Sequence, residues 1–185
     1  CGIGTQTELL AKFSTDGSIT AIDISPKSIE IAKQRLQNYS QVTFITGDII
    51  TLRLEAENKF DVIVLPDVIE HIPLESHLKL FAKLRSLLKD DGFIVIHIPN
   101  PNYLAWLNEN RKELLQIIDQ PIYTDVLCLN VYPNDLYIHY LETYQIGHPN
   151  CDYQVMILKS RKAANNYPEK IYAPTFVQKV VYKLK

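Results

Sequence analysis

The sequence of 185 residues is poor in several features that would otherwise assign it to a class. Its three cysteines, Cys1, Cys128 and Cys151, form neither a CxxC pair nor a disulfide framework, which favours a reducing cytoplasm as its location. No apolar run is long enough to span a bilayer, so no membrane partner is expected. Basic residues are not clustered and the formal net charge is −2, so no nucleic-acid partner is expected either.

The beginning of the sequence lacks an initiator methionine, and no strand precedes its glycine loop. Residues 1–7 read Cys-Gly-Ile-Gly-Thr-Gln-Thr. Gly2 and Gly4 have no Cβ and tolerate positive φ, so the backbone can approach a ligand closely. The helix expected from Thr5 to Phe13 would present free N–H groups to an anionic group. Such a loop normally follows a strand. We therefore expect a chain truncated at its N-terminus, with the first strand of its sheet missing.

Hydrophobic residues make up 46% of the sequence and charged residues 22%, which is typical of a globular protein. Short apolar runs expected to be strands (18–22, 42–45, 61–65 and 93–98) alternate with segments of helical periodicity (5–13, 26–36 and 74–88). Asp90-Asp91-Gly92 is expected to turn the chain before the last of these strands. This alternation predicts an α/β fold with a doubly wound, mostly parallel, Rossmann-like sheet and helices on both faces.

Beyond Pro99 the alternation is weaker. We expect a helix over 103–118, helix and loop over 121–136, and two β-rich runs at 137–146 and 153–158, which supply an antiparallel closing strand. Residues 1–160 are therefore predicted to form one domain. Residues 161–185 are predicted to be a linker or C-terminal extension, leading into a further fused domain. Ten of the eleven tyrosines follow residue 100. They could line an acceptor pocket or simply favour strands, and both readings stay open.

Three acidic residues come at the ends of predicted parallel strands, where ligands of open sheets bind. Asp23 lies nineteen positions after Gly4, the spacing of a carboxylate that accepts hydrogen bonds from a ribose. Asp48 would suit the amine of adenine, and Asp67 follows the third predicted strand. Thr7 replaces the third glycine of a dinucleotide fingerprint, which argues against a nicotinamide dehydrogenase. A cationic adenosine ligand fits so many carboxylates better than a pyrophosphate does.

Five segments resemble motifs of the class I S-adenosylmethionine (SAM)-dependent methyltransferases, in the subgroup that modifies small molecules and glycans. The resemblance covers residues 1–100 closely and 137–158 more loosely. The segments are Cys1-Gly2-Ile3-Gly4-Thr5, Asp23-Ile24-Ser25, Gly47-Asp48-Ile49, Phe60 to Ile72 with its Glu70-His71 pair, and Leu87-Leu88-Lys89 with Gly92.

The resemblance implies SAM as cofactor and methyl transfer to a small-molecule or glycan acceptor, with a hydroxyl as the methylated group. It implies a cofactor site made of Cys1, Gly2, Gly4, Asp23, Ile24, Asp48, Ile49 and Pro66. His71 can change its charge near neutral pH, so it is the candidate base, with Asp67 orienting it or serving instead.

Each candidate also has a purely structural interpretation. Asp23 and Asp48 could cap local turns, and Asp67, Glu70 and His71 could be solvated residues after a strand. His97, inside a predicted buried strand, is expected to be packed in the core and to matter for stability.

Two other functions stay open. One is a non-catalytic SAM-binding domain of a larger protein. The other is metal-assisted O-methylation, in which Asp67, Glu70 and His71 hold a divalent cation. No spacing identifies a further histidine ligand, so no metal is included in the predicted site.

Overall fold

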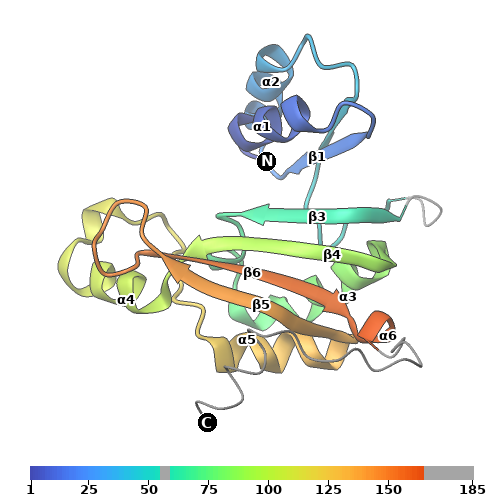
Figure 1. Cartoon of the computed structure of the whole chain (residues 1–185). Coiled ribbons are helices and arrows are strands. Elements are labelled where there is room, and N and C mark those ends of the chain that lie inside the picture. The colour runs from blue at the N-terminus through green and yellow to red at the C-terminus, as the bar shows by residue number, and fades with distance from the viewer. Residues whose placement is uncertain (55–58, 165–185) are drawn as a thin grey trace, which may run out of the picture.

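The glycine loop and the first two strands form one unit of the fold. The computed structural model describes residues 1–54 and 59–164. Strands β1 (Ile19–Asp23) and β2 (Val42–Thr46) pair in parallel, and helices α1 (Thr5–Phe13) and α2 (Pro26–Arg35) pack against them (Figure 1). Helix α2 begins where the sequence predicts, because Ser25 Oγ accepts a hydrogen bond from the Ser28 N–H and Pro26 occupies the first helical position.

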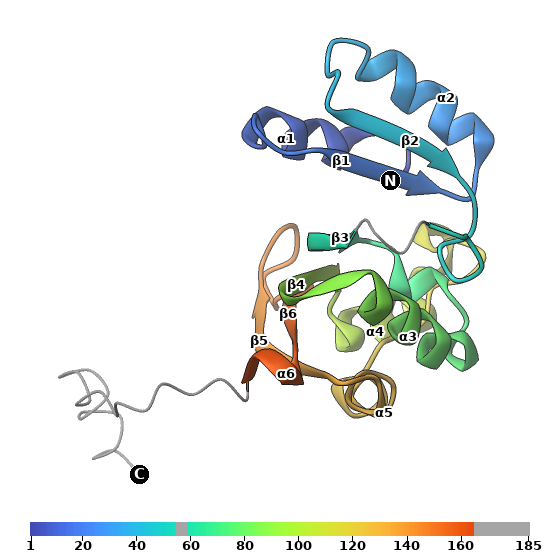
Figure 2. The same cartoon turned by 90° about the vertical axis from the view of Figure 1, so that its right-hand side faces the viewer.

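The second unit is a four-stranded sheet with the order β3-β4-β6-β5. Its strands are β3 (Phe60–Pro66), β4 (Leu88–Pro99), β5 (Leu136–Tyr144) and β6 (Tyr153–Ser160). Strands β3 and β4 are parallel, whereas β6 pairs antiparallel with both β4 and β5. Helices α3 (His77–Leu87) and α5 (Thr124–Val131) lie on one side of this sheet (Figure 2).

The main core lies between that sheet and these two helices. It is built from side chains that alternate along the strands and recur at helical spacing, among them Leu80, Phe81, Leu84, Ile94, Ile96, Leu127 and Met156. Ile49 and Ile50, just beyond β2, also pack against this core and so connect the first unit to the second.

Short elements complete the described chain. They are the 3₁₀ turns η1 (Ile69–His71), η2 (Leu74–Ser76), η3 (Lys112–Leu114) and η4 (Tyr132–Asn134), and the helices α4 (Pro101–Asn110) and α6 (Arg161–Ala164). Within residues 1–54 and 59–164, none of the helices combines the length and apolar character needed to cross a bilayer.

The α/β fold class with parallel strands and an antiparallel closing strand is confirmed. Strands β1 and β3 are each at an edge of their own sheet, and no described strand pairs with both. That a further strand precedes residue 1 stays a prediction. The predicted extension begins as helix α6, and its residues from 165 onward lie outside the described part of the chain.

Two local predictions are wrong. The helix expected over 103–118 ends at Asn110, because residues 116–120 make hydrogen bonds with the segment after β3 instead of continuing the helix. The turn expected at 90–92 lies inside β4, where the register with β3 shifts. A Cβ on Gly92 would lie 2.7 Å from the Asp61 carbonyl oxygen, so this glycine allows the strands to approach rather than turning the chain.

Candidate functional site

The glycine loop and the end of β1 are joined through one carboxylate. Asp23 Oδ2 accepts a hydrogen bond from the Gly2 N–H at 2.7 Å, and its Oδ1 accepts from the Ser25 N–H at 2.9 Å. Burial raises the pKa of Asp23, but these donors outweigh it and lower the pKa below its usual value. Asp23 is therefore an ionised acceptor beside a glycine-rich backbone.

Both glycines of this loop have the backbone conformation that the sequence suggested. Gly2 has φ 54° and Gly4 has φ 85°, the left-handed region that other residues rarely adopt. Gly4 is also the residue at the N-terminus of α1, and the Glu8 N–H bonds to its carbonyl oxygen. The loop therefore places the beginning of α1 close to Asp23.

The ends of β1 and β2 are tied together by the backbone. The Gly47 N–H donates to the Asp23 carbonyl oxygen at 2.9 Å, which places Asp48 next to Asp23 at the carboxyl ends of the two strands. Asp48 Oδ1 accepts from the Ile50 N–H at 2.9 Å, so this carboxylate does cap its own turn. Ile24 is 73% exposed beside Asp23, whereas Ile49 packs against the core.

The third acidic residue, Asp67, stands at the end of β3 in a left-handed conformation with φ 49°. Its N–H donates to the His97 carbonyl oxygen at 2.8 Å, which extends the pairing beyond Pro66. Burial raises the pKa of Asp67, partly offset by the nearby His97 and His71 and by the Tyr153 hydroxyl.

Glu70 is buried, contrary to the interpretation of this turn as solvated. Its side chain is 1% exposed, and its Oε2 has no hydrogen-bond partner among the residues that the structure describes. Burial raises the pKa of Glu70 to about 7, and the negative charges of Asp67 and Asp119 act in the same direction. A carboxyl whose pKa lies near 7 can donate a proton as well as accept one close to neutral pH.

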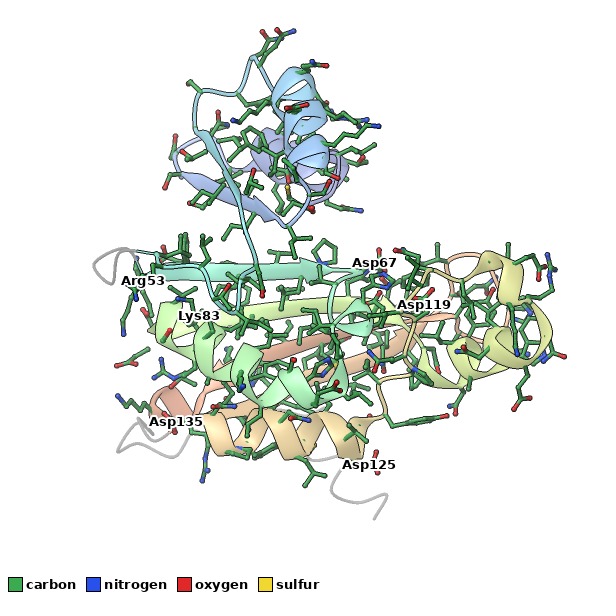
Figure 3. The ribbon with its side chains drawn as sticks, turned by 180° about the vertical axis from the view of Figure 1, so that it is seen from behind. Arg53, Asp67, Lys83, Asp119, Asp125 and Asp135 are labelled. Carbon is green, nitrogen blue, oxygen red and sulfur yellow. The ribbon has the colours of Figure 1, made fainter. Side chains whose placement is uncertain are left out.

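Both ring nitrogens of His71 have polar neighbours. Its Nδ1 lies 2.7 Å from the Ile118 carbonyl oxygen and 3.1 Å from Asp119 Oδ1. Its Nε2 lies 3.8 Å from Glu70 Oε1 and 3.3 Å from the side-chain nitrogen of Gln116. Asp67 and Asp119 are both at this end of the sheet, whereas Asp135 lies at the other end (Figure 3).

His97 does not lie in the core as expected, although its ring is packed against other side chains. It points to the face of β4 opposite to the buried Ile96 and Ile98, and it is partly exposed. Its ring stacks on Tyr153, with centroids 4.8 Å apart, and also contacts Tyr144. Burial, followed by the charges of Asp67 and Glu70, raises the pKa of Tyr153 to about 12, so its hydroxyl keeps its proton.

Sequence reasoning missed the residues that surround His71. Asp119, Gln116 and Gln120 come from a segment expected to be helix or loop, more than forty positions along the chain. Gln120-Pro121 does signal a break just after the helix expected over 103–118, since a residue before proline avoids the helical conformation. No spacing in the sequence indicates that this segment lies against His71.

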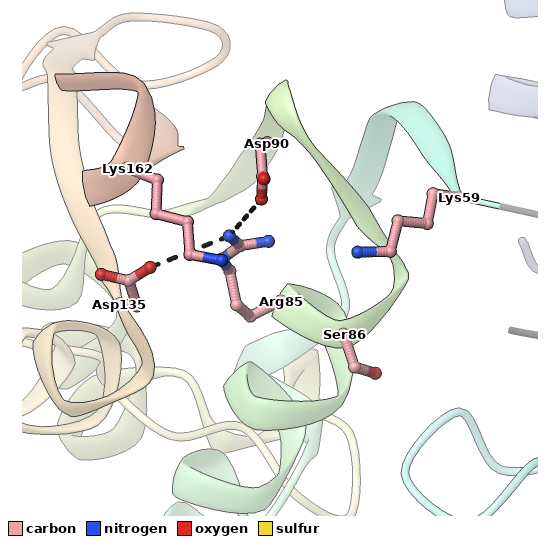
Figure 4. A pocket seen from close by; sticks show the side chains of 6 residues that line it. All are labelled: Lys59, Arg85, Ser86, Asp90, Asp135 and Lys162. Atoms are coloured by element: carbon pink, nitrogen blue, oxygen red, sulfur yellow. Dashed lines mark hydrogen bonds and ion pairs between the residues drawn. The ribbon is translucent and has the colours of Figure 1, made fainter. Parts of the chain in front are cut away.

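The part of the chain that the structure describes contains no cluster of three or more potential metal-ligating side chains. A shallow hollow of about 330 Å³ does lie elsewhere, lined by Lys59, Arg85, Ser86, Asp90, Asp135 and Lys162 (Figure 4). Lys59 immediately precedes β3, so the hollow is at the opposite end of that strand from Asp67. Arg85 is already paired there with Asp90 at 2.6 Å and Asp135 at 3.8 Å.

The strands and helices therefore form a Rossmann-like fold with polar groups gathered after β1, β2 and β3. In sequence, residues 1–92 match the model of a methyltransferase domain. The chain is 30% identical over 125 residues to a malonyl-[acyl-carrier protein] O-methyltransferase of Halalkalibacterium halodurans, covering 65% of this chain and 45% of the relative. It is also 30% identical over 142 residues to a phosphoethanolamine N-methyltransferase of Plasmodium falciparum, covering 69% and 51%.

In structure, the chain is similar to the N-methyltransferase NodS of Bradyrhizobium japonicum in complex with S-adenosyl-L-homocysteine. The TM-score is 0.67 at 18% identity, over 85% of this chain and 73% of NodS. By sequence, residues 1–92 therefore carry a methyltransferase domain, and over most of its length the chain has the fold of SAM-dependent methyltransferases. It spans about half the length of the curated relatives described above.

Proposed function

We propose that the protein containing this chain transfers a methyl group from SAM to a small-molecule or glycan acceptor, at a hydroxyl group. The observation that supports SAM binding is the hydrogen bond of 2.7 Å from the Gly2 N–H to Asp23 Oδ2. A carboxylate held ionised beside a glycine loop can accept hydrogen bonds from the two hydroxyls of a ribose. Exposed Ile24 would pack on the adenine, and Asp48 would accept from its amine.

The remaining proposed cofactor residues lie around the same position. Cys1 and Gly4 complete the loop, Ile49 follows Asp48, and Pro66 ends the strand before Asp67. The cofactor's methyl group is expected to point towards Asp67 and His71. SAM supplies the electrophilic methyl group when it is bound. The chain's residues bind it, orient the acceptor and exclude water.

His71 is the proposed base and Asp67 a second catalytic candidate. Because the Ile118 carbonyl can only accept, His71 Nδ1 carries the ring hydrogen and Nε2 keeps a lone pair in the neutral ring. Nε2 could therefore take the proton of an acceptor hydroxyl while that oxygen is methylated. The O–H bond would break as an N–H bond forms on Nε2, and SAM, when bound, would supply the methyl group for the new C–O bond and leave as its demethylated thioether.

The names of the relatives suggest acceptors to test. The full-length protein should bind S-adenosylhomocysteine in calorimetry. It should then be supplied with SAM carrying a labelled methyl group and with phosphoethanolamine, a malonyl thioester of acyl carrier protein, or a small-molecule extract of cells. Label on a hydroxyl oxygen of a small molecule, lost by about 100-fold or more in His71→Ala with unchanged cofactor affinity, supports the proposal. Label on the amine of phosphoethanolamine or on the malonyl carboxylate would support methyl transfer but contradict a hydroxyl as the methylated group.

The two alternatives predict different results. A non-catalytic SAM-binding domain would bind S-adenosylhomocysteine and label nothing in the extract. A metal-assisted enzyme would lose activity with a chelator and regain it with Mg²⁺ or Mn²⁺, which His71 acting as a base does not require.

A further inference from the structure

Two oxygen atoms from residues 118–119 lie against one nitrogen of His71. The Ile118 carbonyl oxygen is 2.7 Å from Nδ1, and Asp119 Oδ1 is 3.1 Å from the same atom. Neither oxygen is expected to donate a hydrogen bond at neutral pH, so both orient the Nδ1–H. The carboxylate adds a negative charge that the carbonyl lacks.

Asp119 is itself held in place. Its Oδ2 accepts a hydrogen bond from the Gln116 N–H at 2.7 Å, and its side chain is only 10% exposed. The carboxylate therefore uses one oxygen to hold its own loop and turns the other towards His71. A side chain fixed in this way loses little further freedom when the histidine becomes charged.

The loop that carries Asp119 is fastened to the turn that carries His71. Gln120 Nε2 donates to the Ile72 carbonyl oxygen at 2.9 Å, and the Gln120 N–H donates to the Glu70 carbonyl oxygen at 3.1 Å. These contacts fix the backbone on both sides of His71. They are separate from the Asp119 contact, so removing the charge of Asp119 leaves the loop attached.

We propose that Asp119 is a positioning residue for His71, an inference that rests on the proposed function. It holds the ring in the tautomer that leaves Nε2 free, and its charge stabilises the imidazolium formed when Nε2 takes the acceptor's proton. In this structure the Gln116 side-chain amide lies 3.3 Å from Nε2, in the position that the hydroxyl of an acceptor molecule would take. An acceptor hydroxyl would displace it.

Other acidic groups also face this ring, so the test has to separate their effects from that of Asp119. Glu70 Oε1 lies 3.8 Å from Nε2, on the side opposite to the Asp119 contact, and Asp67 is close enough to His71 for their charges to interact. Asp119→Asn removes one charge and keeps the shape of the side chain and an oxygen for Nδ1. Asp125→Asn, an exposed carboxylate on α5, removes the same charge elsewhere and is the matched control.

The titration of His71 in the full-length protein, followed by nuclear magnetic resonance with labelled histidine, tests this. We expect a proton on Nδ1 in the neutral ring. In Asp119→Asn the midpoint of the titration should fall by about one pH unit or more, because the imidazolium loses its neighbouring charge. Asp119→Glu should restore most of this shift, and Asp125→Asn should cause none. An unchanged midpoint in a folded Asp119→Asn protein, or a neutral ring with its proton on Nε2, would overturn the proposal.

The outcome is separable from that of the proposed function, since the titration needs neither cofactor nor acceptor. If Asp119→Asn shifts the titration but His71→Ala retains full methyl transfer, the proposed base is wrong while the contact is real. If His71→Ala is inactive and Asp119→Asn has no effect on the titration, only the role of Asp119 is wrong.

Discussion

The N–H of Gly2 donates a hydrogen bond of 2.7 Å to Oδ2 of Asp23, and so connects two segments that are 21 residues apart in the sequence. Asp23 consequently has two roles in the proposed site. It would bind the ribose of the cofactor, and it holds the glycine loop in position before the cofactor arrives.

Substitutions of Asp23 separate these two roles. Asp23→Ala should weaken S-adenosylhomocysteine binding by about 3 kcal/mol or more, because two charge-assisted hydrogen bonds to the ribose are lost. Asp23→Asn keeps an oxygen that can accept from the Gly2 N–H, so it should weaken S-adenosylhomocysteine binding less than Asp23→Ala does. Calorimetry on both variants measures the difference, with Asp16→Ala, an exposed carboxylate, as control. Equal affinity in wild type and Asp23→Ala would discard the ribose assignment.

The two glycines of the loop should differ in their tolerance of a side chain. A Cβ on Gly4 would lie 2.7 Å from Leu36 Cδ1 and 3.0 Å from Ala32 Cβ, whereas a Cβ on Gly2 has nothing within 4 Å. Gly2→Ala therefore costs only the strain of positive φ, about 1 kcal/mol, and Gly4→Ala adds overpacking, for about 3 kcal/mol in total. Urea denaturation measures the free energy of unfolding of both variants. Similar losses in the two would contradict the expected overpacking at Gly4.

The buried carboxyl of Glu70 should make stability depend on pH. The folded protein keeps the Glu70 proton up to about pH 7, because its pKa is raised from 4.5, whereas the unfolded chain releases that proton near pH 4.5. The free energy of unfolding should therefore fall as pH rises between these values, by about 3 kcal/mol.

Glu70→Gln isolates this effect, since glutamine is neutral at every pH. Denaturation at pH 4.5, 6 and 7.5 should show wild type losing stability relative to the variant. Glu75→Gln, an exposed neighbour, is the control and should follow wild type. Parallel curves for wild type and Glu70→Gln would mean that Glu70 is charged in the folded protein.

His77 should matter for stability rather than for binding. Its side chain is fully buried, and Nε2 lies 3.0 Å from the Ile69 carbonyl oxygen and 2.9 Å from that of Ile72. His77→Ala removes this link between α3 and the turn that carries His71, and leaves a cavity. It should cost about 2–4 kcal/mol of stability.

His71→Ala, at a partly exposed position, is the matched comparison and should cost less than half as much. Thermal unfolding of both variants, with S-adenosylhomocysteine affinity measured where each is folded, checks the distinction. A His77 variant as stable as wild type would show that its two contacts contribute nothing net.

Local patterns determined much of the fold. The alternation of buried runs and helical spacing predicted β1 to β4 and α1 to α3, and the Ser25-Pro26 signal placed the start of α2. These features depend on residues close together in the chain, where propensity, capping and periodicity act. The positions of Asp23, Asp48 and Asp67 at strand ends followed from the same patterns, because the carboxyl ends of strands are where the chain leaves the sheet.

Contacts between distant segments were decided only by the tertiary structure. Nothing in the local sequence indicates that Asp119 meets His71, or that Gln120 fastens its loop to the turn after β3. The burial of Glu70 and the exposure of one face of β4 at His97 are likewise decided by which elements pack against them. The sequence by itself determined which residue types stand at the strand ends. Their partners, burial and protonation depended on the packing of segments 40 or more residues away, because desolvation and charge act through space rather than along the chain.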